Sequence, residues 1–204
     1  MEIFMKKIIV ATGNEGKMKE IRQILGGENV EIVSLKDENL QDVEIVEDGK
    51  TFEENALIKA STIAKITGTM VLADDSGLEV DYMGKAPGVY SARYMGEDTP
   101  YTIKNNHIID ELKDAKGDER SARFVCVIAC VFPDGKSITT RGTIEGQIGY
   151  EEKGSNGFGY DPIFYLPERG CTTAELSPEE KNKISHRGKA LTAMYEKLKE
   201  ENIL

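Results

Sequence analysis

The stretch Lys6-Lys7-Ile8-Ile9-Val10-Ala11-Thr12-Gly13-Asn14-Glu15-Gly16-Lys17 holds an apolar run, a turn and a helix start in direct succession. Residues 6–11 predict a buried strand, and Thr12-Gly13-Asn14 predict the turn after it. Apolar side chains then recur at helical spacing, at Met18, Ile21 and Leu25, so we expect a helix over 15–25 that ends at Gly26-Gly27. A strand that leads directly into a helix is the repeating unit of α/β folds.

Strand and helix signals alternate further along the chain, until a hairpin replaces them. Thr51, followed three residues later by Glu54, forms a capping box that starts a helix, and Gly68 ends it. Pro133-Asp134-Gly135 separates two strand-like runs and predicts the hairpin. The predicted elements are strands at 30–33, 69–73, 78–82, 124–132 and 137–148, helices at 51–67, 100–112, from 178 and at the C-terminus, and irregular segments at 34–50, 76–96 and 153–162.

The order of these elements favours an α/β fold with a mixed sheet. The 204 residues suit one domain, residues 1–204, with or without a division into two lobes. A net charge of −10 disfavours nucleic acid as a partner, but a local cluster of cations can still bind a small phosphorylated ligand. The longest apolar run, residues 124–132, is too short to cross a membrane. The N-terminal stretch shows neither the hydrophobic region nor the cleavage site of a signal peptide, so we expect a cytoplasmic protein.

The three cysteines predict neither a disulfide nor a zinc site. Cys126 and Cys130 lie four residues apart in a predicted strand, which separates them by roughly 13 Å. That separation is too large for a disulfide. We expect buried thiols in a reducing compartment.

Two adjacent carboxylates, Asp74 and Asp75, directly follow the predicted strand 69–73. Ligands of open α/β sheets gather at the carboxyl ends of strands. Because neighbouring strand residues point to opposite faces, one carboxylate can face a site while the other is structural. Carboxylate oxygens suit Mg²⁺, which also neutralises phosphates. The alternative is a solvated acidic turn.

The turn from Thr12 to Lys17 is a candidate phosphate-binding segment. Its small residues let backbone amides approach an anion, and the helix N-terminus and Lys17 add positive charge. The spacing matches neither a Walker A loop nor the dinucleotide fingerprint. An ordinary tight turn into a helix is the alternative.

Three further segments are candidates, each with a plain structural alternative. Residues 154–161 interleave glycines with Phe158 and Tyr160, which suits either base stacking or core filling. Lys181 and residues 185–187 either attract an anion or cap and pack a helix. Residues 44–48 either supply a metal ligand, for which Glu47 is the first choice, or are solvated.

Asn55 and Lys59 are spaced i, i+4 on the predicted helix 51–67, so their side chains project together. They either line a cleft or border solvent.

Taken together, these segments resemble the inosine triphosphate pyrophosphatase family, the house-cleaning enzymes for deaminated purine nucleotides. The resemblance covers about residues 7–200. It rests on the segments Thr12-Gly13-Asn14…Lys17…Glu20, Thr51-Phe52-Glu53-Glu54-Asn55-Ala56…Lys59-Ala60, Ala73-Asp74-Asp75-Ser76-Gly77-Leu78, Pro87-Gly88-Val89-Tyr90-Ser91-Ala92-Arg93-Tyr94, Gly157-Phe158-Gly159-Tyr160-Asp161-Pro162-Ile163-Phe164 and Glu175-Leu176…Lys181…Ser185-His186-Arg187-Gly188.

The resemblance implies hydrolysis of ITP, dITP and XTP to the monophosphate and pyrophosphate, Mg²⁺ dependence, a homodimer, and a long mixed sheet with two lobes around a cleft. Asp75 would be the proton acceptor and a metal ligand, with Glu47 and Asp74 as further candidate ligands. The substrate would contact Thr12, Gly13, Asn14, Glu15, Gly16, Lys17, Lys59, Ser76, Phe158, Gly159, Tyr160, Asp161, Lys181, His186 and Arg187.

This assignment agrees with the chemistry of phosphoanhydride cleavage. Attack between the α and β phosphates needs an oriented water, a base and cations on the leaving pyrophosphate. Two other readings remain: a pyrophosphatase of the same fold for other modified nucleotides, and a non-catalytic nucleotide-binding module. The second has no need of two carboxylates beside phosphates.

Overall fold

The computed structural model describes residues 6–27 and 30–204, which form two compact units. Unit 1 comprises the described part of Met1–Asp75 with Cys126–Gly142 and Arg187–Leu204. Unit 2 comprises Ser76–Val125 and Thr143–His186. The N-terminal residues 1–5, on which the expectation about a signal peptide rests, lie outside the described residues.

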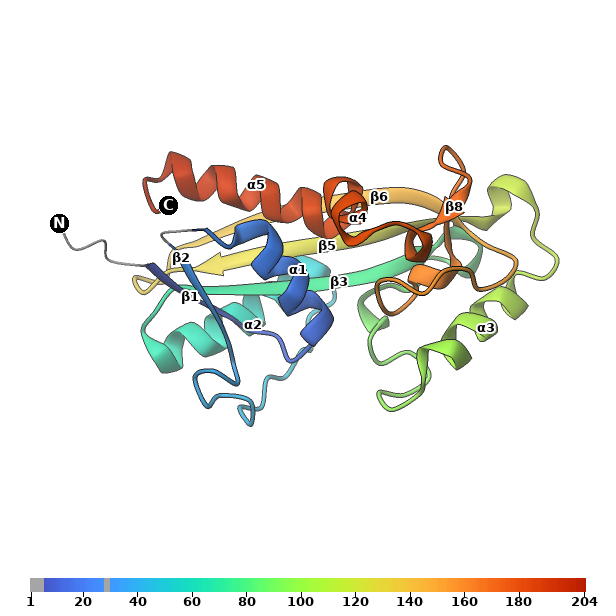
Figure 1. Cartoon of the computed structure of the whole chain (residues 1–204). Helices are drawn as coiled ribbons and strands as arrows, with labels where there is room; N and C mark the ends of the chain where they lie inside the picture. Colours follow the sequence, from blue (N-terminus) through green and yellow to red (C-terminus); the bar gives the residue numbers. More distant parts are fainter. Residues whose placement is uncertain (1–5, 28–29) are drawn as a thin grey trace. The chain divides into compact units, whose positions relative to one another are not determined.

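The secondary structure is a mixed sheet with helices, as the sequence predicts (Figure 1). The strands follow the order β2-β1-β3-β5-β6-β7-β8, and β4 pairs with β3. β1 is parallel to both of its neighbours, whereas β7 is antiparallel to both of its own. The elements are β1 (Lys6–Val10), α1 (Glu15–Leu25), β2 (Val30–Ser34), α2 (Phe52–Thr67), β3 (Val71–Val80), β4 (Ala86–Pro87), α3 (Tyr101–Glu111), β5 (Ser121–Val131), β6 (Ser137–Ile148), β7 (Phe164–Leu166), β8 (Cys171–Thr172), α4 (Pro178–Ile184) and α5 (His186–Glu200).

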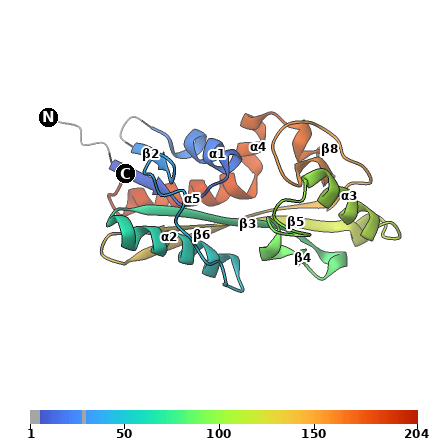
Figure 2. The same ribbon diagram turned by 90° about the horizontal axis from the view of Figure 1, so that it is seen from below.

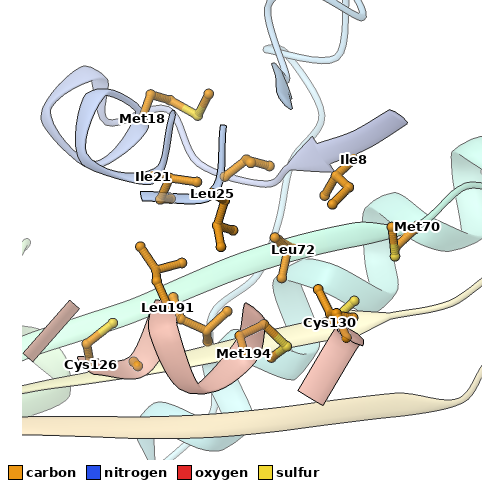
Figure 3. Close-up of a cluster of buried hydrophobic side chains, with 14 residues drawn as sticks. Ile8, Met18, Ile21, Leu25, Met70, Leu72, Cys126, Cys130, Leu191 and Met194 are labelled. Atoms are coloured by element: carbon orange, nitrogen blue, oxygen red, sulfur yellow. The ribbon is translucent and has the colours of Figure 1, made fainter. Parts of the chain in front are cut away.

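In unit 1, helices cover both faces of the sheet. α1 and α5 lie over one face and α2 lies over the other (Figures 1 and 2). The face under α1 and α5 carries alternate residues of β1, β3 and β5, because successive strand residues point to opposite sides. Figure 3 shows this core, whose buried members are Ile8, Val10, Met18, Ile21, Leu25, Met70, Leu72, Cys126, Ile128, Cys130, Ala190, Leu191, Met194 and Leu198.

Helix α2 matches its sequence prediction at both ends. Thr51 Oγ1 accepts from the Glu54 amide, and Glu54 Oε2 accepts from the Thr51 amide, which completes the capping box. Gly68 ends the helix with a left-handed φ of 62°. The predicted apolar stripe is buried throughout: Phe52, Ala56, Ala60, Ile63 and Ala64.

The prediction for strand β3 is wrong in one respect that matters for the site. The sequence predicts a strand that ends at Ala73, two acidic residues directly after it, and a separate short strand over 78–82. The structure has one continuous strand, Val71–Val80, so Asp74 and Asp75 lie in its middle. Both side chains are buried, which also removes the alternative of a solvated acidic turn.

Unit 2 has its own apolar core, built from residues of β3, β5, β6 and α3 and of the segment that follows β6.

The three thiols are free; Cys126 and Cys130 are buried as expected, whereas Cys171 is only half-buried. Among residues 6–27 and 30–204, no helix combines the length and the apolar character that a membrane span needs.

Candidate functional site

Buried polar side chains gather within each of the two units. In unit 1, the ammonium group of Lys59 lies between two carboxylates. Lys59 Nζ donates to Asp75 Oδ1 at 2.8 Å and to Glu47 Oε2 at 2.7 Å. From the sequence, Lys59 and Asn55 were predicted either to line a cleft or to border solvent. Both side chains are buried in the structure. Glu47, Lys59 and Asp75 are thus brought together from a loop, a helix and a strand.

Burial and charge act against each other in this group. Burial raises the pKa of Asp75, although the nearby Lys59 and Lys17 lower it. Burial alone would lower the pKa of Lys59, but Asp75 and Glu47 outweigh it and raise that pKa. A second cation beside Asp75 would therefore favour its charged form.

The group is suited to share a divalent cation with a substrate. Asp75 Oδ2 is buried and has no hydrogen-bond partner among the described residues, so one oxygen of this carboxylate remains open to a cation. Within the same part of the chain, no three His, Cys, Asp or Glu side chains converge as a complete metal site. Mg²⁺ commonly takes only one or two protein carboxylates and completes its shell with phosphates and water. Asp75 and Glu47 fit that mode.

Asp74 faces the opposite side of β3 and has different partners. Its Oδ2 accepts from Arg187 Nε at 2.8 Å and lies 3.0 Å from Cys126 Sγ, and its Oδ1 pairs with Lys17 Nζ. Arg187 also pairs with Glu20. The alternation along the strand therefore separates the two carboxylates as predicted, one toward Lys59 and one toward Lys17 and Arg187.

This second cluster keeps Asp74 charged inside the core. Burial by itself would raise its pKa, but Arg187 and Lys17 outweigh burial and hold the pKa of Asp74 well below its usual range. The pKa of Arg187 is raised in turn by Asp74 and Glu20, against the effect of its own burial. Both oxygens of Asp74 are engaged by cations, so the geometry favours Asp75 over Asp74 as a metal ligand.

The turn Thr12–Lys17 lies next to Asp74, because the Ala11 amide donates to Leu72 O at 2.7 Å. Asn14 is the N-cap of α1, and its Oδ1 accepts from the Lys17 amide at 3.0 Å. Gly13 and Glu15 are exposed and Gly16 is half-buried. A Cβ built on Gly13 would meet no atom within 4 Å, so packing within the protein does not require glycine there. Close approach of a ligand would require it.

Unit 2 gathers Phe158 and Lys181 around the carboxylate of Asp161. Asp161 Oδ2 accepts from Lys181 Nζ at 2.7 Å and from the Phe158 amide at 2.8 Å. Lys181 Nζ lies 5.1 Å from the centroid of the Phe158 ring. At Gly157, which has a φ of 73°, a Cβ would lie 2.2 Å from Asp161 Oδ2. The loop is therefore folded tightly around Asp161, and Phe158 remains half-buried.

The remaining predicted site residues of unit 2 differ in their burial and in their contacts. Tyr160 is buried, and its hydroxyl donates to Ser91 O at 2.7 Å, which matches the core-filling alternative. Gly159 is half-buried and accepts from Asn105 through its carbonyl. His186 is buried and stacks on Phe124 at 4.7 Å. Ser76 is half-buried on β3.

Sequence reasoning did not select Glu20 or Cys126 as functional residues. Glu20 lies three residues after Lys17, so helical spacing places the two on one face of α1. Cys126 was expected only as a buried apolar residue, and no local pattern indicates its contact with Asp74. Burial and the neighbouring Asp74 raise the pKa of this thiol well above its usual value.

Comparison with known proteins gives a consistent match over the chain. The profile of the Ham1 family matches residues 8–197. A Bacillus licheniformis protein named dITP/XTP pyrophosphatase is 50% identical over 187 residues, which is 92% of this chain and 95% of that protein. A Clostridium perfringens protein of the same name is 47% identical over 201 residues, 96% of this chain and 98% of that protein.

Solved structures agree with the match in sequence. The Ham1 protein of Staphylococcus aureus superposes with a TM-score of 0.86 and 39% identity, over 96% of this chain and 100% of its own. The similarity therefore spans both units.

Proposed function

The chain belongs to the Ham1 family, and from that premise we propose that it hydrolyses the deaminated purine nucleoside triphosphates ITP, dITP and XTP. The products would be the nucleoside monophosphate and pyrophosphate, so the reaction removes these nucleotides from the pool. The observation that carries the proposal is the pairing of Lys59 with both Asp75 and Glu47, in a chain whose relatives are named dITP/XTP pyrophosphatases over nearly their whole length.

In this proposal Asp75 orients the attacking water and accepts its proton. A carboxylate suits this role when it is ionised and within hydrogen-bond reach of the water. Lys59 holds Asp75 through Oδ1, which fixes the side chain and leaves the two lone pairs of Oδ2, one for the cation and one for the attacking water. Attack then occurs at the α phosphorus, and pyrophosphate leaves.

Lys17 and the amides of the 12–17 turn would bind the triphosphate and stabilise charge on the leaving group. Asp74 holds the Lys17 ammonium near the start of α1. Asp75 and Glu47 would hold Mg²⁺, which when bound neutralises charge on the phosphates. Asp74 as a third metal ligand remains a prediction, and its two cationic partners make it the weaker candidate.

Selection of the base is proposed for Phe158, Asp161 and Lys181, which are called the unit 2 cluster. Hypoxanthine and xanthine carry an acceptor at C6 where adenine carries a donor, so a donor in the pocket is left unpaired against ATP. Lys181 is such a donor, and Phe158 offers a ring face for stacking. Asp161 already accepts from Lys181, Phe158 and Thr173, so it would act by holding them rather than by contacting the base. Direct contacts of the nucleotide with Gly159, Tyr160, His186, Arg187 and Ser76 remain predictions.

The proposal also includes a homodimer, which rests on the resemblance, and a cytoplasmic location, which stays an expectation from the sequence. A pyrophosphatase for other modified nucleotides is the alternative function. It differs from the main proposal only in the base that the unit 2 cluster accepts.

Product analysis with isotope-labelled water tests the reaction directly. With XTP, Mg²⁺ and water enriched in ¹⁸O, we expect xanthosine monophosphate that carries the label and pyrophosphate that does not, because water attacks the α phosphorus. Omitting Mg²⁺ should abolish the reaction. Release of the diphosphate and inorganic phosphate would contradict the assigned cleavage site, and undiminished turnover in a chelator would contradict the metal.

A further inference from the structure

Asn55 is a buried polar residue to which neither the family match nor the proposed mechanism assigns a role. It lies in the first turn of α2, one turn before Lys59, and its exposed fraction is 0%. Residues spaced i, i+4 share a helix face, so Asn55 projects from the same face of α2 as Lys59, whose ammonium group contacts Asp75 and Glu47. A buried carboxamide needs partners for both its oxygen and its nitrogen.

The oxygen of Asn55 anchors the segment that carries Glu47. Asn55 Oδ1 accepts from the Gly49 amide at 2.9 Å. A Cβ on Gly49 would lie 2.6 Å from that oxygen and 2.7 Å from the Cβ of Glu54, so only glycine fits this approach. Glu54 Oε2 accepts from the next amide, of Lys50, at 2.6 Å. The backbone two residues after Glu47 is therefore fixed to the start of α2.

The nitrogen of Asn55 is buried and has no hydrogen-bond partner in the part of the chain that the structure describes. Leaving a buried donor unsatisfied costs about 1–3 kcal/mol, so native proteins rarely keep one without a use. Lys59 cannot accept this hydrogen bond, because an ammonium group is only a donor.

A second buried polar atom of unit 1 also has no hydrogen-bond partner. Asp75 Oδ2 is likewise buried without a partner among the described residues. The two open atoms are opposite in kind: the carboxylate oxygen suits a cation, and the amide nitrogen suits an anion. A phosphate group together with a divalent cation would satisfy both at once.

We propose that Asn55 joins the Glu47 segment to the substrate, with Oδ1 holding Gly49 and Nδ2 donating to a phosphate oxygen of the bound nucleotide. This assignment rests on the proposed function and adds a residue to its phosphate-binding group. Binding of the nucleotide then reinforces the position of Glu47, because both depend on one carboxamide.

Three variants separate the two halves of this role. Asn55→Asp keeps the acceptor for Gly49 and replaces the donor with a second acceptor. Asn55→Ala removes both. Gly49→Ala leaves Asn55 intact but displaces its carboxamide. Lys65→Ala, at an exposed position on the same helix, is the matched control.

The readouts are binding constants: for Mn²⁺ with the nucleotide-free protein, and for dITP with a methylene bridge between its α and β phosphates. We expect Asn55→Asp to keep Mn²⁺ affinity at or above wild type and to bind the analogue at least about tenfold more weakly, as loss of a hydrogen bond to a charged group implies. We expect Asn55→Ala and Gly49→Ala to lose at least about fivefold in Mn²⁺ affinity, because Glu47 is no longer held.

Two results would overturn the assignment. If Asn55→Asp binds the analogue within about twofold of wild type, Asn55 Nδ2 does not contact phosphate in the wild-type protein. If Asn55→Ala and Gly49→Ala both keep wild-type Mn²⁺ affinity, Asn55 Oδ1 does not position Glu47.

If circular dichroism shows that Asn55→Ala does not fold, the near-isosteric Asn55→Asp tests the contact with phosphate and Gly49→Ala tests the positioning of Glu47. A wild-type protein that binds the analogue but hydrolyses no dITP would contradict the proposed activity and leave Asn55 to be judged by these constants.

Discussion

Replacing Asp75 by Asn is expected to reduce turnover of dITP by at least about 10³-fold while the variant still binds the nucleotide. Asparagine has nearly the shape of aspartate but neither accepts a proton at pH 7 nor carries charge for a cation. Lys59 keeps Glu47 as a partner, so the local structure should persist. The measurement is kcat for dITP with saturating Mg²⁺, paired with a binding constant for the methylene-bridged analogue.

Asp37→Asn is the control for this result. Asp37 also forms an ion pair in unit 1, with Arg22, but lies on the surface. That variant should keep the activity of the wild type. If Asp75→Asn also keeps it, Asp75 is not the proton acceptor. If nucleotide binding is lost together with turnover, Asp75 acts mainly in binding and not in the chemical step.

Replacing Arg187 by Met is expected to lower the free energy of unfolding by about 3–5 kcal/mol. Arg187 is 2% exposed and pairs with Asp74, whose side chain is fully buried, and with Glu20. Its loss leaves Asp74 with Lys17 as its remaining cationic partner in this cluster. Urea unfolding followed by circular dichroism measures the change. Arg22→Met, which removes an ion pair between half-exposed groups, should cost less than about 1 kcal/mol.

The pH dependence of the stability loss in Arg187→Met tests whether the buried carboxylate of Asp74 causes it. In the wild type the pKa of Asp74 is depressed, so its stabilisation is present above about pH 4 and is lost as the pH falls through the folded-state pKa. In Arg187→Met burial predominates and raises that pKa, so the variant loses stability as the pH rises. The difference between the two proteins should therefore be larger at about pH 8 than at about pH 4.

Adding Asp74→Asn to Arg187→Met should restore part of the lost stability, since it removes the buried charge. A double variant less stable than Arg187→Met alone would contradict this explanation. So would a stability difference that does not change with pH.

The sequence predicted most of the fold because local signals coincide with the tertiary structure. Helix α2 is an example, since its capping box, its apolar stripe and its terminal Gly68 all indicate the same boundaries. Strand β3 is the exception. Asp and Gly are depleted in strands, so the segment Asp74 to Gly77 predicted a break. The strand continues because cations on both faces compensate the two carboxylates, at Lys17 and Arg187 on one side and at Lys59 on the other.

The candidate site was predictable to a similar extent. Alternation along a strand predicted that Asp74 and Asp75 face opposite ways, and spacing predicted that Asn55 and Lys59 project together. Which cation meets which carboxylate depends on the packing of α1, α2 and α5 on the sheet, which no local pattern encodes. The contact of Cys126 with Asp74 joins residues 52 positions apart and was not predictable for the same reason.

The measurement that tests the central claim most directly is kcat/KM for dITP, XTP, dATP, dGTP and dTTP under one condition, with Mg²⁺ and added inorganic pyrophosphatase to report pyrophosphate as phosphate. The proposed function predicts that dITP and XTP exceed dATP by at least about 100-fold, because the donor assigned to Lys181 would have no acceptor at C6 of adenine. Equal values for dITP and dATP would contradict the assignment to deaminated purines.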